Sequence, residues 1–339
     1  MTIDTECHDF DSVNRYIWGK TSSGERFGID KILSLAKELR IPVNFFVDIP
    51  EAVRYGKEYV QSIVTIIHDA GQKAYIHLHP NYISGENEQT FFWKYSVKEK
   101  ATILKQTKEL AESFLSKEEM RVFRIGRYGA DAEMYDVLKR VLGREVIDFS
   151  YCYENDKMCH LTESEVGTKN KVILYKDCLL FPNTRYIGFC FGGITKTFNL
   201  DAFETSLGEF KTIIDSNELD NITITMHSWS FIKSFFFVKN KVWGDSASVE
   251  KFRAMVQYAK SKGYVFSDIS ESRTCILPSN KDQIINLCVS PLGKIKALLT
   301  NFLRFQNIAR LSRKYFFIYS VFYVLLLAIL VCVVLMIAL

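Results

Sequence analysis

The stretch Ala74-Tyr75-Ile76-His77-Leu78-His79-Pro80 is the part of the chain around which the rest is organised. Side chains in a β-strand alternate between two faces, so His77 and His79 share one face while Leu78 lies on the other. Pro80 ends the strand because it has no backbone N–H for the ladder. Two imidazoles at a strand end suit a divalent metal that keeps one position open for water, although a His-x-His pair also occurs as ordinary packing.

Strands and helices alternate on both sides of this stretch. Apolar runs predict strands over 2–6, 43–47, 74–79, 146–151, 222–228 and 264–266, and a strand that runs into a glycine turn over 122–129. Helical apolar stripes predict helices over 28–39, 50–70, 98–115, 132–142, 201–214 and 249–262. An alternation of strand and helix is typical of an α/β fold with a parallel sheet or barrel.

Polar or ionisable residues lie at the ends of five of the predicted strands. They are Asp4 and Glu6, His77 and His79, Arg124, Asp148, and His227. In a β/α barrel the carboxyl ends of the strands converge on one face, where active sites lie. The two N-terminal acids alone could be a solvated chain end. Five polar strand ends together are hard to explain by packing, so the sequence predicts one shared site.

The composition limits the classes of protein to which the chain can belong. The chain has 339 residues, 48% of them hydrophobic, and a net charge of +4. No acidic residue follows Asp282, whereas six basic residues do: Lys294, Lys296, Arg304, Arg310, Arg313 and Lys314. The positive balance therefore belongs to the tail and gives no argument for nucleic-acid binding. The eight cysteines are scattered without a Cys-x-x-Cys pair, which predicts free thiols in a reducing compartment.

The C-terminal stretch is apolar and carries no charge from Tyr315 to Leu339. At 1.5 Å per residue such a helix spans a hydrocarbon core of about 30 Å. Basic residues just before it predict a single-pass C-terminal anchor with the catalytic part in the cytoplasm. Residues 292–311 predict an amphipathic helix on the anionic inner membrane surface; a helix docked on the globular domain is the alternative. We therefore divide the chain into a catalytic domain, 1–275, a basic juxtamembrane segment, 276–314, and a transmembrane helix, 315–339.

The ordered motifs resemble the polysaccharide deacetylase family, also called the NodB-homology or carbohydrate esterase family 4 proteins. The likeness covers roughly residues 1–270 and lies in Thr2–Glu6, Asn44–Val47, His77–Pro80, Arg124–Gly129, Asp148–Ser150 and Thr225–Ser228. The family's first motif is usually Thr-Phe-Asp-Asp-Gly, so Thr5 replaces the second Asp. The two histidines stand two residues apart, where the family usually has four.

The resemblance implies a distorted (β/α) barrel, an Asp-His-His site for a divalent metal, usually zinc, and hydrolysis of N-acetyl groups on amino sugars. On this chain the metal ligands would be Glu6, His77 and His79, with Glu6 supplying the carboxylate as in branches with an acid-x-acid pattern. The spacing of the two histidines on a strand still permits both to bind one metal ion.

The same resemblance implies catalytic roles for four further residues. Asp4 would take a proton from the attacking water, and Arg124 would keep Asp4 ionised and oriented, because a neighbouring cation favours a charged carboxylate. His227 would be the general acid that protonates the leaving amine. Asp148 would orient His227 or Arg124.

The predicted membrane anchor limits which substrates the catalytic domain can reach. A catalytic domain tethered to the cytoplasmic side reaches nucleotide sugars and lipid-linked saccharides, so we expect an amino sugar of a surface-glycan precursor. The alternatives are a non-catalytic member of the fold that binds a glycan or a metal, a hydrolase of another amide such as an N-formyl group, and a membrane scaffold without a site.

Overall fold

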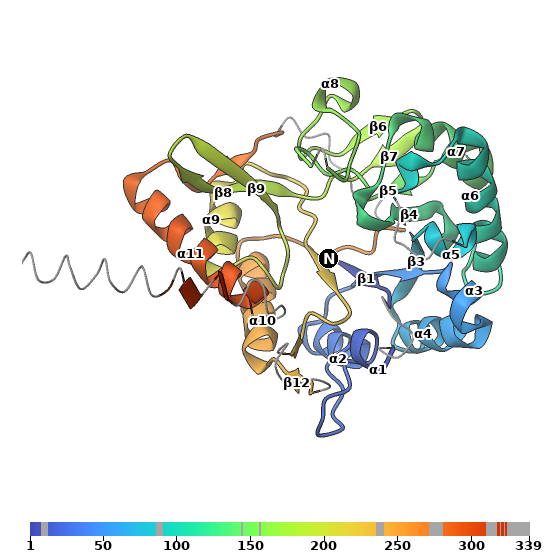
Figure 1. Ribbon diagram of the computed structural model, residues 1–339, viewed down its shortest axis with the longest axis horizontal. Coiled ribbons are helices and arrows are strands. Elements are labelled where there is room, and N and C mark those ends of the chain that lie inside the picture. Colours follow the sequence, from blue (N-terminus) through green and yellow to red (C-terminus); the bar gives the residue numbers. More distant parts are fainter. Residues whose placement is uncertain are drawn as a thin grey trace, which may run out of the picture.

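The computed structural model describes residues 1–7, 13–85, 91–143, 145–155, 157–234, 241–270, 281–309, 317–318, 320–321 and 323. Its centre is an eight-stranded sheet in the order β10-β1-β2-β3-β4-β5-β7-β6 (Figure 1). These strands are β1 (Thr2–Thr5), β2 (Asn44–Asp48), β3 (Lys73–Leu78), β4 (Val122–Ile125), β5 (Ile147–Asp148), β6 (Ile173–Tyr175), β7 (Cys178–Leu180) and β10 (Thr225–His227).

The sheet is a curled half-barrel. Its neighbouring strands run parallel except for the β6–β7 hairpin, which is antiparallel. Within the described residues no pairing joins the edge strands β10 and β6, so the predicted barrel is open at this point. The parallel α/β arrangement expected from the alternation of elements is confirmed.

Amphipathic helices cover the outer face of the sheet (Figure 1). They are α2 (Ile29–Leu39), α3 (Glu51–Tyr55), α4 (Lys57–Asp69), α6 (Val97–Ala111), α7 (Ala132–Leu142) and α10 (Ser246–Ser261). The apolar stripe of α4, for example, buries Val60, Ile63 and Ile67 completely. The helix predicted over 50–70 is divided into α3 and α4 at Gly56, whose φ of +92° is incompatible with a continuous helix.

Short elements connect these layers. They are α1 (Val13–Tyr16), α5 (Asn81–Ser84), α8 (Glu163–Val166), the 3₁₀ helices η2 (Phe92–Lys94), η3 (Glu119–Arg121) and η4 (Gly126–Tyr128), and the strand pair β11 (Ile232–Lys233) and β12 (Trp243–Gly244). The helices α5 and η4 follow β3 and β4 within two residues, so they lie near the carboxyl ends of these strands.

A second, three-stranded sheet lies beside the half-barrel and was not anticipated from the sequence. It consists of β8 (Arg185–Phe191), β9 (Ile194–Asn199) and β13 (Ile285–Asn286), flanked by α9 (Leu207–Ser216) and α11 (Pro291–Ala309). The predicted helix over 292–311 is therefore present as α11 and packs on β8. The predicted domain boundary at 275 falls outside the described residues, and β13 and α11 beyond it belong to the folded body.

The C-terminal predictions have two further outcomes. The strand predicted over 264–266 is wrong, because this segment has no regular secondary structure. The residues that follow are held by the Asn44 side chain, which donates to the backbone oxygen of Ser267 at 3.1 Å and accepts the N–H of Ile269 at 3.2 Å. None of the helices described in the structure is both long and apolar enough to cross a membrane. Most of the predicted span, 315–339, lies outside the described residues.

Candidate metal centre

The strand register brings the predicted site residues to one face of the half-barrel. Asp4 on β1 is opposite His227 on β10, and His77 on β3 is opposite Arg124 on β4. Residues that are opposite one another in parallel strands point the same way, so these four side chains face the interior. Their neighbours in sequence, such as Ile3, face outward and pack under the helices.

Glu6, His77 and His79 form a buried cluster. One ligand atom from each lies within 4.8 Å of the others. His77 Nε2 is 3.2 Å from Glu6 Oε2, and His79 Nε2 also lies against this oxygen. All three residues are at most 6% exposed. Thr5, in contrast, points to the outer face and its hydroxyl binds the carbonyl oxygen of Ile3, so Glu6 is the carboxylate that meets the histidines.

The two imidazoles are presented for metal binding by their surroundings. His77 Nδ1 is 3.1 Å from the carbonyl oxygen of Arg124, a bond in which Nδ1–H donates and which leaves the Nε2 lone pair free for a cation. His79 Nε2 is buried and is turned toward Glu6 Oε2. Its ring lies on Gly126, where an added Cβ would stand 2.6 Å from the ring atoms. Two imidazole nitrogens and one carboxylate oxygen match the three protein ligands of a catalytic zinc site.

The charges in the cluster also favour a cation. Burial by itself raises the pKa of Glu6, but the imidazoles of His79 and His77 outweigh it and hold the pKa of this carboxyl well below its usual range. Burial lowers the pKa of His77, yet the Asp4 and Glu6 carboxylates reverse the effect and raise it. A buried anion thus faces two imidazoles, and a divalent metal bound among them would balance its charge.

Asp4 and Arg124 form a second pair beside the cluster. Arg124 is completely buried, and its Nη1 donates to Asp4 Oδ1 at 2.5 Å while Nη2 donates to Thr2 Oγ1 at 3.0 Å. The guanidinium also lies 4.5 Å from the centre of the Phe46 ring, and this cation–π contact helps to hold it in place. Asp4 is therefore held in a fixed orientation near the metal ligands without being one of them.

His227 lies at the open edge of the site. Its Nε2 is 3.9 Å from Glu6 Oε1, and its side chain is 38% exposed. The ring stacks on Trp229 with a centroid distance of 4.5 Å, and Trp229 in turn contacts Tyr16 edge-on. This histidine can therefore meet both the cluster and a molecule that enters from solvent.

The orienting role predicted for Asp148 does not fit the structure. Asp148 is opposite Phe123 in the register of β4 and β5, so its side chain points to the outer face. There it accepts hydrogen bonds from Tyr135 Oη at 2.7 Å and Ser150 Oγ at 2.5 Å. Among the described residues no hydrogen bond joins it to His227 or Arg124. Asp148 is thus a buried structural carboxyl group under α7.

Two buried acids near the site were missed by the sequence reasoning. Asp48, the last residue of β2, is fully buried; its Oδ1 accepts the backbone N–H of His79 at 3.2 Å and its Oδ2 has no hydrogen bond. Burial raises the pKa of Asp48 to about 8. Glu51 accepts from Tyr59 Oη at 2.9 Å and from the N–H of Cys7. The signal that could have revealed Asp48 is an acid at the carboxyl end of a buried strand.

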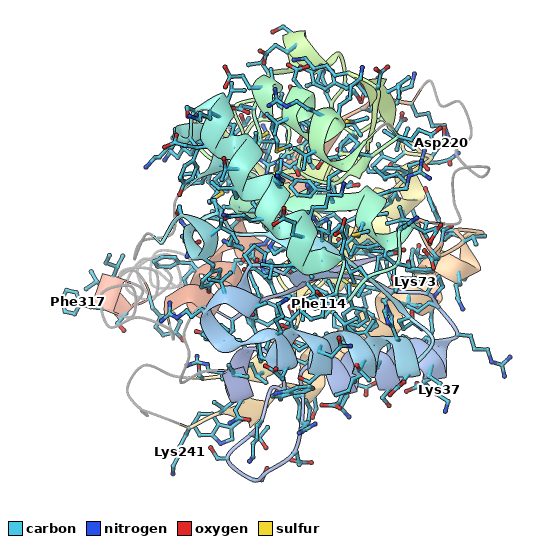
Figure 2. All side chains as sticks on the ribbon, turned by 90° about the vertical axis from the view of Figure 1, so that its right-hand side faces the viewer. Lys37, Lys73, Phe114, Asp220, Lys241 and Phe317 are labelled. Carbon is cyan, nitrogen blue, oxygen red and sulfur yellow. The ribbon has the colours of Figure 1, made fainter. Side chains whose placement is uncertain are left out.

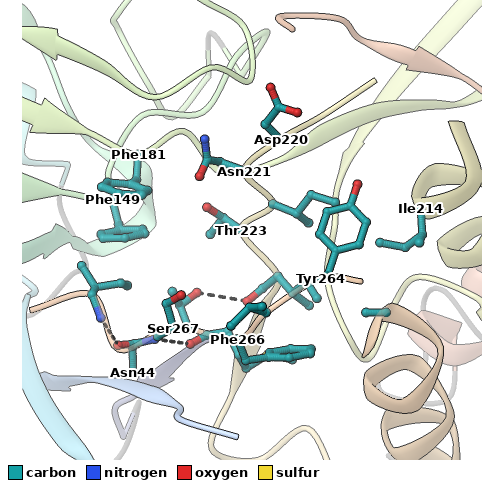
Figure 3. A pocket seen from close by; sticks show the side chains of 17 residues that line it. Asn44, Phe149, Phe181, Ile214, Asp220, Asn221, Thr223, Tyr264, Phe266 and Ser267 are labelled. Atoms are coloured by element: carbon teal, nitrogen blue, oxygen red, sulfur yellow. Dashed lines mark hydrogen bonds between the residues drawn. The ribbon is translucent and has the colours of Figure 1, made fainter. Parts of the chain in front are cut away.

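A separate cavity of about 140 Å³ opens at the other end of the half-barrel (Figure 3). Residues from the amino ends of strands line it, including Thr2 and Asn44, together with Phe149, Thr223 and Tyr264. The amide of Asn44 is already bonded to the backbone on both sides, as the dashed lines in Figure 3 show. This cavity lies away from the acids and histidines, which are at the carboxyl ends of the strands.

Comparisons with known proteins give structural neighbours only. No family model and no curated protein matches the chain. Among solved structures, it is similar to a protein from Mycobacterium smegmatis assigned as a polysaccharide deacetylase (TM-score 0.45, 12% identity, 74% of this chain and 77% of that one). It is also similar to a chitin deacetylase from the fungal pathogen Colletotrichum lindemuthianum (0.39, 13%, 83% and 89%) and to a CE4 family pseudoenzyme from Bacillus anthracis (0.40, 14%, 80% and 64%). At these TM-scores the likeness decides nothing about the activity of this chain.

Proposed function

We propose that this protein is a metal-dependent hydrolase that removes an N-acyl group, in the first place N-acetyl, from an amino sugar. The observation that supports it most is the buried Glu6–His77–His79 cluster with the Asp4–Arg124 pair beside it. A structural metal site is closed by four protein ligands, whereas three ligands leave room for water and a substrate.

Glu6, His77 and His79 would hold the metal, and zinc suits their nitrogen and oxygen atoms best. When bound, a divalent metal supplies a polarised amide carbonyl and a water that ionises near neutral pH. The hydrogen bond from His77 Nδ1 to the Arg124 carbonyl fixes the ring that presents Nε2.

The neighbouring residues would move the protons. Asp4 accepts the proton of the attacking water, and the Arg124 guanidinium keeps the Asp4 carboxylate in place during this step. His227, half exposed at the edge of the site, donates a proton to the amine that leaves. The ring of Trp229 beside His227 offers an apolar face on which a sugar ring can stack.

We further propose that the amino sugar belongs to a surface-glycan precursor at the inner face of a membrane. Support comes from the sequence, because the charge-free stretch Tyr315–Leu339 follows a segment with basic residues and no acidic ones. The membrane location remains a proposal, as most of this stretch lies outside the described residues.

The metal and the reaction can be tested together with a matched pair of histidine variants. His77→Ala should lose both bound metal and the release of acetate from N-acetylglucosamine oligomers. His68→Ala should keep both, because His68 lies on the surface at the end of α4 and binds Glu119. The measurements are metal content of the purified full chain by elemental analysis and acetate release by an enzyme-coupled assay.

Each contrary result has a distinct meaning. Metal bound by the unaltered chain with no release of acetate or formate would contradict the hydrolase and leave a metal-binding protein. Release of formate from an N-formyl sugar, without acetate release, would replace the N-acetyl substrate. Activity that survives in His77→Ala without metal would refute the ligand assignment.

A further inference from the structure

Helix α11 turns its apolar side away from the protein. The exposed side chains follow helical spacing and form what we call the outer row, which consists of Leu292, Ile295, Leu298, Leu299 and Leu303. Each is between 45% and 61% exposed. Lys294 and Lys296 on the same helix are also exposed. Large leucine side chains gathered in one row are unusual on a surface that faces only water.

The opposite side of α11 fixes the helix on the protein through small and polar residues. Ala297 is 5% exposed, and Asn301 Nδ2 donates to the carbonyl oxygen of Gly188 on β8 at 2.8 Å. Arg304 is 8% exposed; it donates to Glu209 at 2.7 Å and lies 4.2 Å from the centre of the Phe198 ring. The outer row therefore points outward because the polar side is engaged, and a simple rotation of the helix could not bury it.

The chain beyond α11 indicates what covers the outer row. The charge-free stretch Tyr315–Leu339 starts six residues after the last residue of α11. Tyr323 of this stretch stacks on Phe302 of α11 with a ring distance of 6.2 Å, and Phe317 is 70% exposed. Tyr323 of the apolar stretch thus lies against α11. The same helix carries the exposed Lys294 and Lys296, as expected where a protein meets anionic headgroups.

The carboxyl ends of the strands face the side of the molecule on which Phe317 lies. In Figure 2, Lys37 in the last turn of α2 and Lys73 at the start of β3 lie toward one side, and Phe317 lies on the other. The parallel strands run from the side of Lys73, so their carboxyl ends, with Glu6, His77 and His79, face the side of Phe317.

We propose that the outer row of α11 lies in the headgroup region of a lipid bilayer and holds the metal centre toward that bilayer. The substrate class that follows is an amino sugar carried on a lipid, presented to the site at the membrane surface. This second statement rests on the proposed hydrolase function, whereas the contact between α11 and lipid does not. Burial of each leucine in the interface stabilises the docked state, and the exposed lysines attract anionic lipids.

The contact with lipid is tested by photo-crosslinking of the full chain. A benzoylphenylalanine replacing Leu299 is compared with one replacing Leu174, which is 70% exposed on the edge strand β6. The protein is reconstituted in vesicles of phosphatidylcholine and phosphatidylglycerol, irradiated and analysed by mass spectrometry. We expect phospholipid adducts at position 299 and none at 174. An adduct of position 299 with residues 315–339 or with a second copy of the chain, or the absence of any phospholipid adduct at this position, would overturn the proposal.

The consequence for the substrate is tested with charged variants. Leu299→Glu should raise the KM for a polyprenyl-linked N-acetylglucosamine in these vesicles by about tenfold, the loss expected when one leucine leaves the interface. Its kcat/KM for soluble N-acetylglucosamine oligomers should stay unchanged, and Leu174→Glu should change neither. Equal KM values for Leu299→Glu and the unaltered chain would overturn the orientation toward lipid. Absence of all deacetylation in the unaltered chain would instead refute the hydrolase, with the crosslinking result unaffected.

Discussion

At the scale of single residues, the metal centre depends on the absence of a side chain at Gly126. The His79 ring occupies the space where a Cβ of residue 126 would lie, and this ring carries one of the three ligand atoms. The backbone of β4 also supplies the carbonyl oxygen that fixes His77. A backbone oxygen of β4 and the glycine that directly follows this strand thus position both imidazoles.

Gly126→Ala should weaken metal binding, because the added methyl group stands 2.6 Å from the His79 ring and must displace it. We expect the loss in metal affinity to be about 10–100-fold, as found when residues that orient metal ligands are altered. Gly208→Ala is the matched control, since a Cβ there meets nothing within 4 Å. Titration with zinc by calorimetry measures both, and equal affinities would contradict the packing argument.

The raised pKa of Asp148 predicts that the stability of the protein depends on pH. Burial raises the pKa of Asp148 from 3.8 to about 6, so the folded protein keeps this proton where the unfolded chain has lost it. This contribution to stability is complete at a pH below the pKa of Asp148 in the unfolded chain. It is lost as the pH rises through the pKa of Asp148 in the folded protein. Relative to Asp148→Asn, the unaltered chain should therefore lose free energy of unfolding from about pH 4 to about pH 6. Urea unfolding at several pH values checks it; a constant difference between the two proteins would contradict it.

At the scale of elements, one arginine joins helix α11 to helix α9, to the turn before α9 and to strand β8. Arg304 of α11 donates to Glu209 of α9, to the carbonyl oxygen of Glu204 and to Tyr186 Oη of β8. Both Arg304 and Glu209 are at most 8% exposed, so this ion pair is largely removed from solvent. The segment after residue 281 therefore stays on the folded body through buried polar contacts.

Arg304→Ala should destabilise the protein by about 3–5 kcal/mol, because the Glu209 carboxylate would remain buried without its partner. Arg253→Ala is the control: Arg253 pairs with Glu38, which is about half exposed, so its loss should cost about 1 kcal/mol or less. Combining Arg304→Ala with Glu209→Gln should recover part of the stability. Chemical unfolding of the four proteins gives the values, and similar losses for the two arginines would show that the buried pair has no special role.

At the scale of the whole molecule, a bound metal would link distant parts of the chain. Glu6 directly follows β1, whereas His77 and His79 lie at the end of β3, more than seventy residues later. A ligand that binds only the folded state adds RT ln(1 + [L]/Kd) to the stability, which is about 2.7 kcal/mol at a hundredfold excess over Kd.

Zinc should therefore raise the Tm of the full chain, and a chelator should lower it again. His77→Ala should show no such response, because one of three ligands is missing, while His68→Ala should behave as the unaltered chain. Differential scanning calorimetry with and without zinc makes the measurement. A Tm rise of equal size in His77→Ala would place the metal elsewhere in the protein.

Glu6, His77 and His79 were predicted to lie together, and the structure brings them together, whereas Asp148 was misplaced. The alternation of side chains was enough to place His77 with His79 and Asp4 with Glu6. Asp148 could not be placed, because its face depends on the register between β5 and β4. The hairpin of β8 and β9 had a local signal that was not used: Gly192 and Gly193, both with positive φ, stand between two strands.

The sequence by itself determined the features that each residue shares with its near neighbours along the chain: the paired histidines, the amphipathic helices and the charge-free C-terminal stretch. Only the tertiary structure decided which strands lie side by side, that Asp48 reaches His79, and which side of α11 docks on β8. Periodicity is a property of consecutive residues and can be read locally. Register and docking depend on contacts between segments far apart in sequence, so they emerge only when the whole chain packs.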